Sequence, residues 1–229
     1  YNPYRINKEG IDWEVVDEDD TWSHIGYWND HQIIYLLKLL EGQWQIDRSF
    51  ILDSLNKKIF STANVPYKIR NDEEILKDPK NTIDFDHALH QKIMNDVKKI
   101  GTDARLVLDQ DQVVHVSMAE KLLVLQLSKL SNFIPDGGIW LNTQRPEWND
   151  ANNALVGYGV SMVTLYYLNR HISFINNVLT DVNETEFDIS NEVLAWFKDT
   201  KQTYEKYSPA INEKLDAVKR KTFVQELQK

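Results

Sequence analysis

One segment of this chain has an especially clear helical pattern, which limits the folds that the rest can adopt. Ser117 is followed three residues later by Glu120, the spacing of a helix N-cap and its capping partner. The apolar residues that follow are Leu122, Leu123, Leu125, Leu127 and Leu130. They recur at helical intervals over residues 118–131 and cover more than a two-position seam. We therefore expect a core helix here rather than an interaction zipper.

Similar patterns and end signals recur along the chain. The other predicted helices run from Asn29/Asp30 to a stop at Gly42, from a cap at Asp47, over 85–100 from a cap at Asp84 to Gly101, over about 152–179, over 191–206, and from Pro209 to the C-terminus. Residues 105–108 and 113–116 predict a small β-hairpin, and residues 67–70 a strand. Helices of similar length joined head to tail predict a mainly α fold of stacked helical hairpins, with residues 1–229 forming a single helical domain.

Composition excludes several classes of function. The net charge is −9 and there is no cysteine among the 229 residues. The acidic balance argues against nucleic acid as a partner, and the absence of cysteine excludes disulfides and thiolate metal sites. No apolar run is long enough to span a membrane and no signal peptide is visible, so we expect a soluble protein with no membrane partner, a cytoplasmic location being favoured. Because the chain begins with Tyr1 rather than Met, we expect it to be part of a larger polypeptide.

The richest concentration of polar chemistry lies in residues 145–153. Glu147 and Asp150 stand beside Trp148 and several amides, with Trp140 shortly upstream. A carboxylic acid can protonate a glycosidic oxygen, and an indole face packs well on the apolar face of a pyranose. The segment therefore indicates a sugar-processing site. The structural alternative is that Asp150 or Asn149 only caps the following helix.

A second cluster of the same kind spans residues 22–31. Trp-Asn-Asp occurs at residues 28–30 and again at 148–150, each time just before an apolar helical pattern. In a ring of helical hairpins, loops at the same end converge on one cavity. The carboxylates of Asp30 and Asp150 would then form an acid/base pair, or an acid and a substrate anchor. The alternative for Asp30 is again a helix N-cap.

The identity of the attacking group stays open at this point. Hydrolysis with inversion needs two carboxyl groups about 6.5–9.5 Å apart, with water between them and the sugar. Phosphorolysis replaces the water by phosphate, for which Arg145 and His31 are the candidate ligands. The alternative for Arg145 is a surface ion pair with Glu147. Inorganic phosphate is thus a possible co-substrate, and we expect no cofactor.

A metal site is not favoured. His87 and His90 lie on one predicted helix near Asp84 and Asp86, but two histidines three residues apart on an amphipathic helix are usually solvated. The chain contains no phosphate-binding glycine loop, no dinucleotide fingerprint and no nucleophile elbow.

The residues Gly26-Tyr27-Trp28-Asn29-Asp30 and Glu147-Trp148-Asn149-Asp150-Ala151 resemble loops of the cellobiose phosphorylase family, whose wider relatives are the glucoamylase-like and glycogen-debranching-like enzymes. The resemblance implies an (α/α) toroid of six helical hairpins, of which this chain would hold an incomplete part. It also implies that Asp150 is the proton donor and Asp30 a carboxylate that binds substrate.

Together these observations predict a carbohydrate-active enzyme domain that cleaves glycosidic bonds of an oligosaccharide or polysaccharide with inversion, by hydrolysis or phosphorolysis. Asp150 would be the general acid, with Glu147 as helper or alternative. The residues expected to contact hydroxyls or stack on sugar rings are Trp28, Asn29, Asp30, His31, Trp140, Trp148 and Asn149, with Arg145 on phosphate. The rival hypothesis is a non-catalytic helical module that uses the same loops to bind a glycan or a protein partner.

Overall fold

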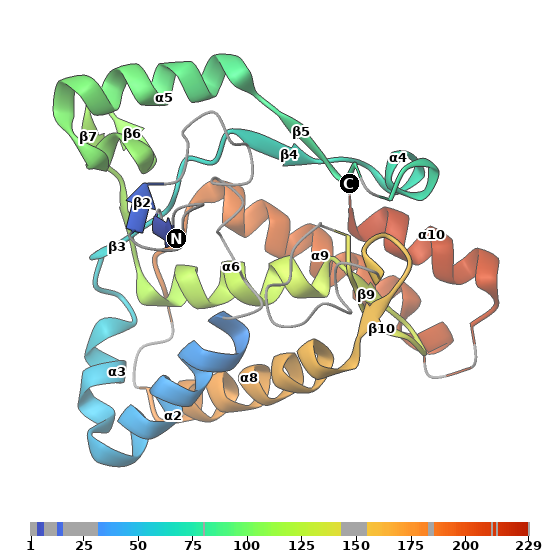
Figure 1. The fold of residues 1–229 in the computed structure, drawn as a ribbon. Helices are drawn as coiled ribbons and strands as arrows, with labels where there is room; N and C mark the ends of the chain where they lie inside the picture. The colour runs from blue at the N-terminus through green and yellow to red at the C-terminus, as the bar shows by residue number, and fades with distance from the viewer. Residues whose placement is uncertain are drawn as a thin grey trace.

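The computed structural model describes residues 4–6, 13–15, 32–79, 81–142, 155–182, 186–211, 213 and 215–228. It is mainly helical (Figure 1). The helical elements are η2 (Gln32–Leu36, a π-helical turn), α2 (Leu37–Ile46), α3 (Arg48–Ser54), α4 (Asp72–Lys77), α5 (His87–Ile100), η3 (Thr102–Arg105, a 3₁₀ turn), α6 (Met118–Leu130), α8 (Met162–Thr180), α9 (Asn191–Ile211) and α10 (Ala217–Leu227). Among the described residues, no helix has the length and apolar character needed to cross a membrane.

The strands are short and pair antiparallel. They are β1 (Tyr4–Ile6), β2 (Trp13–Val15), β3 (Phe60–Ser61), β4 (Tyr67–Ile69), β5 (Ile83–Phe85), β6 (Leu108–Asp109), β7 (Gln112–Val113), β8 (His115–Val116), β9 (Phe133–Ile134), β10 (Gly138–Trp140) and β11 (Val160–Ser161). The pairs are β1 with β2, β3 with β8, β4 with β5, and β6 with β7. In the one three-stranded sheet of the described chain, β10 lies between β9 and β11.

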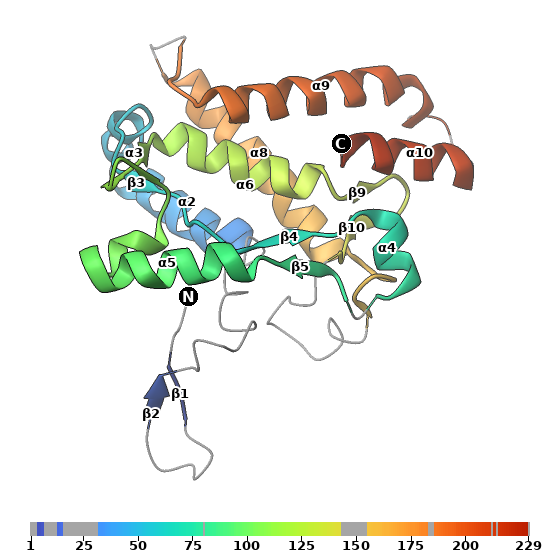
Figure 2. The same cartoon turned by 90° about the horizontal axis from the view of Figure 1, so that it is seen from above.

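Four long helices make two layers, α2 with α8 and α6 with α9 (Figures 1 and 2). Within the first layer, Lys38 lies over the ring of Tyr167, Glu41 pairs with Arg170, and Arg48 at the start of α3 pairs with Asp181. Because both residue numbers rise together along this series, α2 and α8 run parallel.

The second layer is also parallel. Ser117 donates to the carbonyl of Asp188, and Tyr204 donates to the carbonyl of Leu130. The contacts thus advance along α6 and α9 in the same direction. The first layer is antiparallel to the second, since Ile33 and Ile34 of η2 cluster with Leu125 of α6, whereas Leu40, later in the chain, clusters with Met118 and Leu122, earlier in α6.

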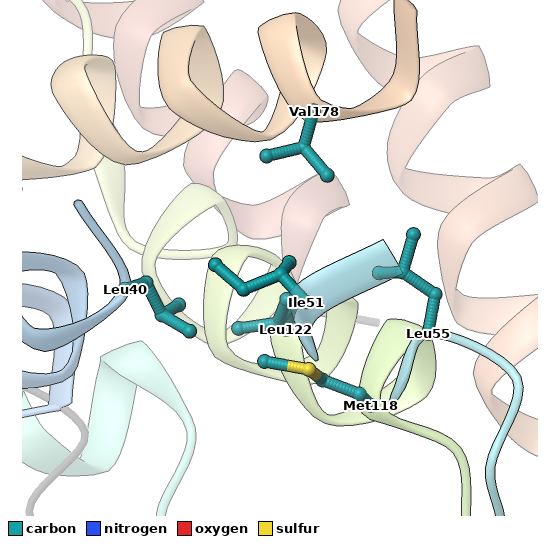
Figure 3. Close-up of a cluster of buried hydrophobic side chains, with 6 residues drawn as sticks. All are labelled: Leu40, Ile51, Leu55, Met118, Leu122 and Val178. Carbon is teal, nitrogen blue, oxygen red and sulfur yellow. The ribbon is translucent and has the colours of Figure 1, made fainter. Parts of the chain in front are cut away.

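Apolar residues of both layers fill the core between them. Figure 3 shows one cluster, in which Leu40 from α2, Ile51 and Leu55 from the α3 region, Met118 and Leu122 from α6, and Val178 from α8 meet. A second cluster holds Ile33, Ile34, Leu125, Ile139 and Leu168. A third joins α10 to β10 and contains Ile75, Trp140, Phe223, Val224 and Leu227.

Several predicted helix starts are confirmed. The Asp47 side chain caps α3 by accepting from the Ser49 amide, and Ser117 caps α6 by accepting from the Glu120 amide. Gly101, at φ +87°, follows the last residue of α5 as predicted. The predicted strand at 67–70 is β4. The predicted hairpin at 105–116 is shorter than expected, because β8 pairs with β3 and only β6 and β7 form the hairpin.

Four predicted boundaries are wrong. Gly42 does not end α2, which continues to Ile46 because Trp44 packs edge-on against Phe174 of α8. Asp84 does not cap α5; it lies in β5 and pairs with Arg70, while Asp86 provides the cap. Pro209 begins no helix, since it lies in the last turn of α9, and α10 begins after a cap at Asp216.

The fourth boundary is the start of the helix predicted over 152–179. It begins only at Met162, because β11 precedes it and pairs with β10.

Candidate functional site

Most residues predicted to form the site fall in two segments of the sequence. We call residues 16–31 the first Trp-Asn-Asp segment and residues 143–154 the second. The predicted site residues in them lie outside the described residues; these are Trp28, Asn29, Asp30, His31, Arg145, Glu147, Trp148, Asn149 and Asp150. The described residues that flank the two segments therefore define what the fold contributes to the site.

The two ends of the second segment are joined at its base. Trp140 pairs with Val160 in the antiparallel ladder of β10 and β11. Beyond the ladder, the Leu141 amide donates to the carbonyl of Gly159 at 3.0 Å, and the Gly157 amide donates to the carbonyl of Leu141 at 2.7 Å. Backbone pairing therefore holds together the described residues on either side of the second segment.

Gly157 is required at this base for two reasons. Its φ of +78° lies in the left-handed region, which disfavours any residue with a Cβ. A Cβ placed there would also lie 2.5 Å from the Cβ of Pro79. The second segment thus rejoins the fold at a position that tolerates only glycine.

Trp140 is a core residue rather than an exposed one. Its side chain is 7% exposed and packs with Ile75 and Phe223 in the third cluster. The indole N–H donates to the carbonyl of Gly157 at 3.1 Å. Because both the ring and its polar atom have partners inside the protein, we assign Trp140 to support of the loop base and leave it out of the residues proposed to contact a ligand.

The first segment joins the fold at a neighbouring place. Ile33 and Ile34, which follow it in η2, are buried with Ile139 of β10 and Leu168 of α8. One core cluster therefore contains residues of three elements. These are β10, which leads into the second segment, α8, which follows that segment, and η2, which follows the first segment.

The direction of the helices adds to this proximity. The first segment leads into η2 and α2, and the second leads through β11 into α8. Since α2 and α8 are parallel neighbours, both segments join this layer at the same end. The N-terminal ends of helices carry partial positive charge and unpaired amides, which favour anionic and hydroxyl-rich groups.

The described tyrosines differ in exposure in a way that the sequence alone did not indicate. Tyr35, Tyr158 and Tyr166 are 55%, 71% and 67% exposed, more than the other tyrosines described between residues 32 and 228. Tyr35 lies in η2, just after the first segment. Tyr158 lies in the turn before β11 and Tyr166 in the first turns of α8, and both follow the second segment. The positions of these tyrosines in the sequence did not predict their exposure, because exposure depends on which helix faces other elements cover.

A buried histidine lies between α6 and α8, away from any exposed surface. His171 has no exposed area, and its Nδ1 lies 3.0 Å from Nε2 of Gln126. Burial lowers the pKa of His171 from 6.5 to about 4, against an opposing effect from Glu41. Among the described residues, its Nε2 has no hydrogen-bond partner. An enclosed neutral imidazole cannot exchange protons with a substrate, so His171 belongs to the core.

The buried carboxylate of Glu120 is likewise structural. It accepts from the backbone amide of Ser190 at 2.7 Å and from the Ser190 hydroxyl at 3.0 Å. Burial lowers the pKa of the adjacent Lys121, whose ammonium group donates to the carbonyl of Ser61. These groups join α6 to the start of α9 and to β3.

No group of three metal-ligating side chains occurs in the part of the chain that the structure describes. His87 and His90 both contact the ring of Phe85.

Comparison with models of known protein families gives no match, and comparison with curated protein sequences gives none either.

Proposed function

We propose that this chain is part of a carbohydrate-active enzyme that cleaves glycosidic bonds with inversion, with Asp150 as the general acid. The observation that carries the proposal is that the described residues flanking the two Trp-Asn-Asp segments lie close together. Both lead into parallel neighbouring helices at the same end of one layer, and their flanking residues pack in one core cluster. Two carboxylates separated by more than one hundred residues in sequence can meet at such a place.

The arrangement of the helices supports a toroid of helical hairpins as the parent fold. In such a ring, successive hairpins stand side by side, so that helices of the same layer run parallel and the two layers run antiparallel. The parallel pairs α2 with α8 and α6 with α9 have this relation. The described helices would form neighbouring hairpins of the ring.

In the proposed reaction, Asp150 donates its proton to the oxygen of the glycosidic bond, which breaks to release the leaving sugar. An oxygen of water or of inorganic phosphate bonds to the anomeric carbon from the opposite face, which inverts its configuration. If water attacks, a second carboxylate, Asp30 or Glu147, accepts its proton. If phosphate attacks, Arg145 and His31 are the proposed ligands for its charge.

The remaining residues of the two segments have supporting roles in this proposal. Asn29, Asp30 and Asn149 would bind sugar hydroxyls, and Trp28 and Trp148 would stack on the ring faces. A general acid stays protonated near neutral pH when apolar surface and like charge surround it, and Trp148 and Glu147 are the sequence neighbours of Asp150 suited to those effects.

The test compares wild type with Asp150→Asn on α- and β-linked oligosaccharides, with and without phosphate, by measuring released sugar and sugar phosphate. Loss of the general acid should lower turnover by about 10²–10⁴-fold with an unchanged melting temperature. Asp53→Asn is the matched control, because Asp53 is exposed on α3. The phosphate dependence of the wild-type reaction separates phosphorolysis from hydrolysis.

Equal turnover in wild type and Asp150→Asn would remove Asp150 from the mechanism. Binding of saccharide by a folded wild-type protein that releases no product would favour the non-catalytic glycan-binding module instead.

A further inference from the structure

Three exposed tyrosines lie near the places where the two segments join the fold. Tyr35 lies in η2 just after the first segment, Tyr158 lies just after the second, and Tyr166 lies one turn into α8. The other tyrosines described between residues 32 and 228 are at least partly buried; these are Tyr67, Tyr167, Tyr204 and Tyr207. A concentration of one exposed aromatic type in one region indicates a binding surface more strongly than the same residues scattered.

The parallel packing of α2 and α8 brings two of these tyrosines to the same level. The ammonium group of Lys38 lies 5.8 Å from the ring centre of Tyr167. Tyr35 is three residues before Lys38, and Tyr166 is the residue before Tyr167. Tyr35 and Tyr166 therefore stand at neighbouring heights on adjacent helices, with Met162 and Val163 also exposed at the start of α8.

The surface changes character farther along α8. At helical spacing after Tyr166, the exposed positions are Asn169, Ser173 and Asn177. A partner helix would require an apolar stripe that continues along this face, which these residues interrupt. Aromatic rings followed by amides and a hydroxyl instead match a ligand that has apolar ring faces and many hydroxyl groups.

We propose that Tyr35, Tyr158 and Tyr166 form a sugar-binding platform beside the two segments, which holds further rings of an oligosaccharide. This proposal rests on the proposed function, because it assigns the substrate class to the same site. A tyrosine suits this role because its ring face packs on a pyranose and its hydroxyl bonds to sugar hydroxyls.

The test measures the affinity of the full chain for α- and β-linked gluco-oligosaccharides of increasing length by isothermal titration calorimetry. In wild type, affinity should rise with each added ring that reaches the platform. Tyr35→Ala and Tyr166→Ala should each weaken binding of the longer oligosaccharides about tenfold, and Tyr158→Ala should weaken it in the same direction. The matching Tyr→Phe variants should retain most of the affinity, since the ring remains.

Phe50→Ala is the control, because Phe50 is a 57%-exposed aromatic residue on α3, at the opposite end of the α2/α8 layer. It should bind like wild type, and circular dichroism should show every variant folded. Wild-type affinity in all three Tyr→Ala variants, or no saccharide binding by wild type, would overturn the platform. If the variants lose affinity while Asp150→Asn turns over normally, the platform stands and the assignment of Asp150 fails.

Discussion

The two helical layers of this protein are held together by different kinds of interaction. Between α2 and α8, polar contacts lie at the surface, as in the ion pair of Glu41 with Arg170. Between α6 and α9, they are enclosed, as in the bonds of Glu120 to Ser190 and of Tyr204 to Leu130. Surface ion pairs contribute little to stability, whereas breaking an enclosed hydrogen bond is costly. We therefore expect the α6/α9 layer and its neighbour α10 to contribute more to stability than the α2/α8 layer, which both Trp-Asn-Asp segments join.

The largest stability effect should come from the aromatic cluster that joins α9 and α10. Phe223 has no exposed area, and its ring centre lies 5.3 Å from those of both Tyr204 and Tyr207. Phe223→Ala should lower the free energy of unfolding by about 3–5 kcal/mol through lost burial and a cavity. Urea denaturation would measure this, with Phe197→Ala as the exposed control on α9. Equal losses in the two variants would show that the buried ring of Phe223 contributes no more to stability than an exposed ring.

The second effect concerns pH and tests the contact of α6 with α8. Because the pKa of His171 is about 4 in the folded protein and near 6.5 when exposed, the unfolded chain binds an extra proton between these values. The free energy of unfolding should therefore fall as pH decreases from about 6.5 to 4, by roughly 3 kcal/mol in total, and this contribution is complete above pH 6.5.

Denaturation of wild type and His171→Gln at several pH values would measure how much His171 contributes to the pH dependence of the free energy of unfolding. The charge of Glu41, which pairs with Arg170, acts on His171, and both proteins retain this pair. Parallel pH curves for the two proteins would show that His171 does not titrate in this window.

A smaller loss is expected at the buried carboxylate of the α6/α9 layer. Glu120→Gln leaves one oxygen where two now accept from Ser190, so unfolding should become easier by about 1–3 kcal/mol. Glu205→Gln, on the exposed face of α9, is the matched control and should change stability little. If Glu120→Gln does not change the free energy of unfolding in the same denaturation experiment, the enclosed polar contacts of this layer do not stabilise it.

The smallest effect should have the opposite sign and lies in the α2/α8 layer. Gly42 is inside α2, and a Cβ there would have no neighbour within 4 Å. Gly42→Ala should stabilise the fold by about 0.5–1 kcal/mol, because it lowers the entropy of the unfolded chain. Gly157→Ala should destabilise it, and calorimetric melting of both variants would show the contrast. A destabilised Gly42→Ala would indicate that this helix face has a neighbour that requires glycine.

Local signals in the sequence predicted where several elements begin, and tertiary packing decided where they end. The caps at Asp47 and Ser117 depend on a side chain and an amide two or three residues away, so the sequence contains all that is needed. The end of α2 depends on Trp44 meeting Phe174, which is a contact between distant segments. Pro209 lies inside the last turn of α9, so this helix extends two residues past a residue type that usually interrupts helices.

The candidate site was predictable only in part for the same reason. The two Trp-Asn-Asp patterns are local and could be read directly from the sequence. Their joining at one end of one layer depends on the parallel packing of α2 and α8, and the exposure of Tyr35 and Tyr166 depends on which faces that packing leaves uncovered. Trp140 illustrates the limit, because its neighbours in sequence indicated a ligand contact while its neighbours in space enclose it.

The parallel register of α2 and α8 also sets the order in which this chain can fold. Glu41 and Arg170 are 129 residues apart in sequence, and no short turn can join parallel neighbours. During synthesis, the apolar face of α2 that α8 later covers stays without its partner until α8 has been made. Contacts of such separation slow folding and expose unfinished surface to aggregation. The packing of α2 against α8 thus makes the newly made chain dependent on its late-synthesised helices.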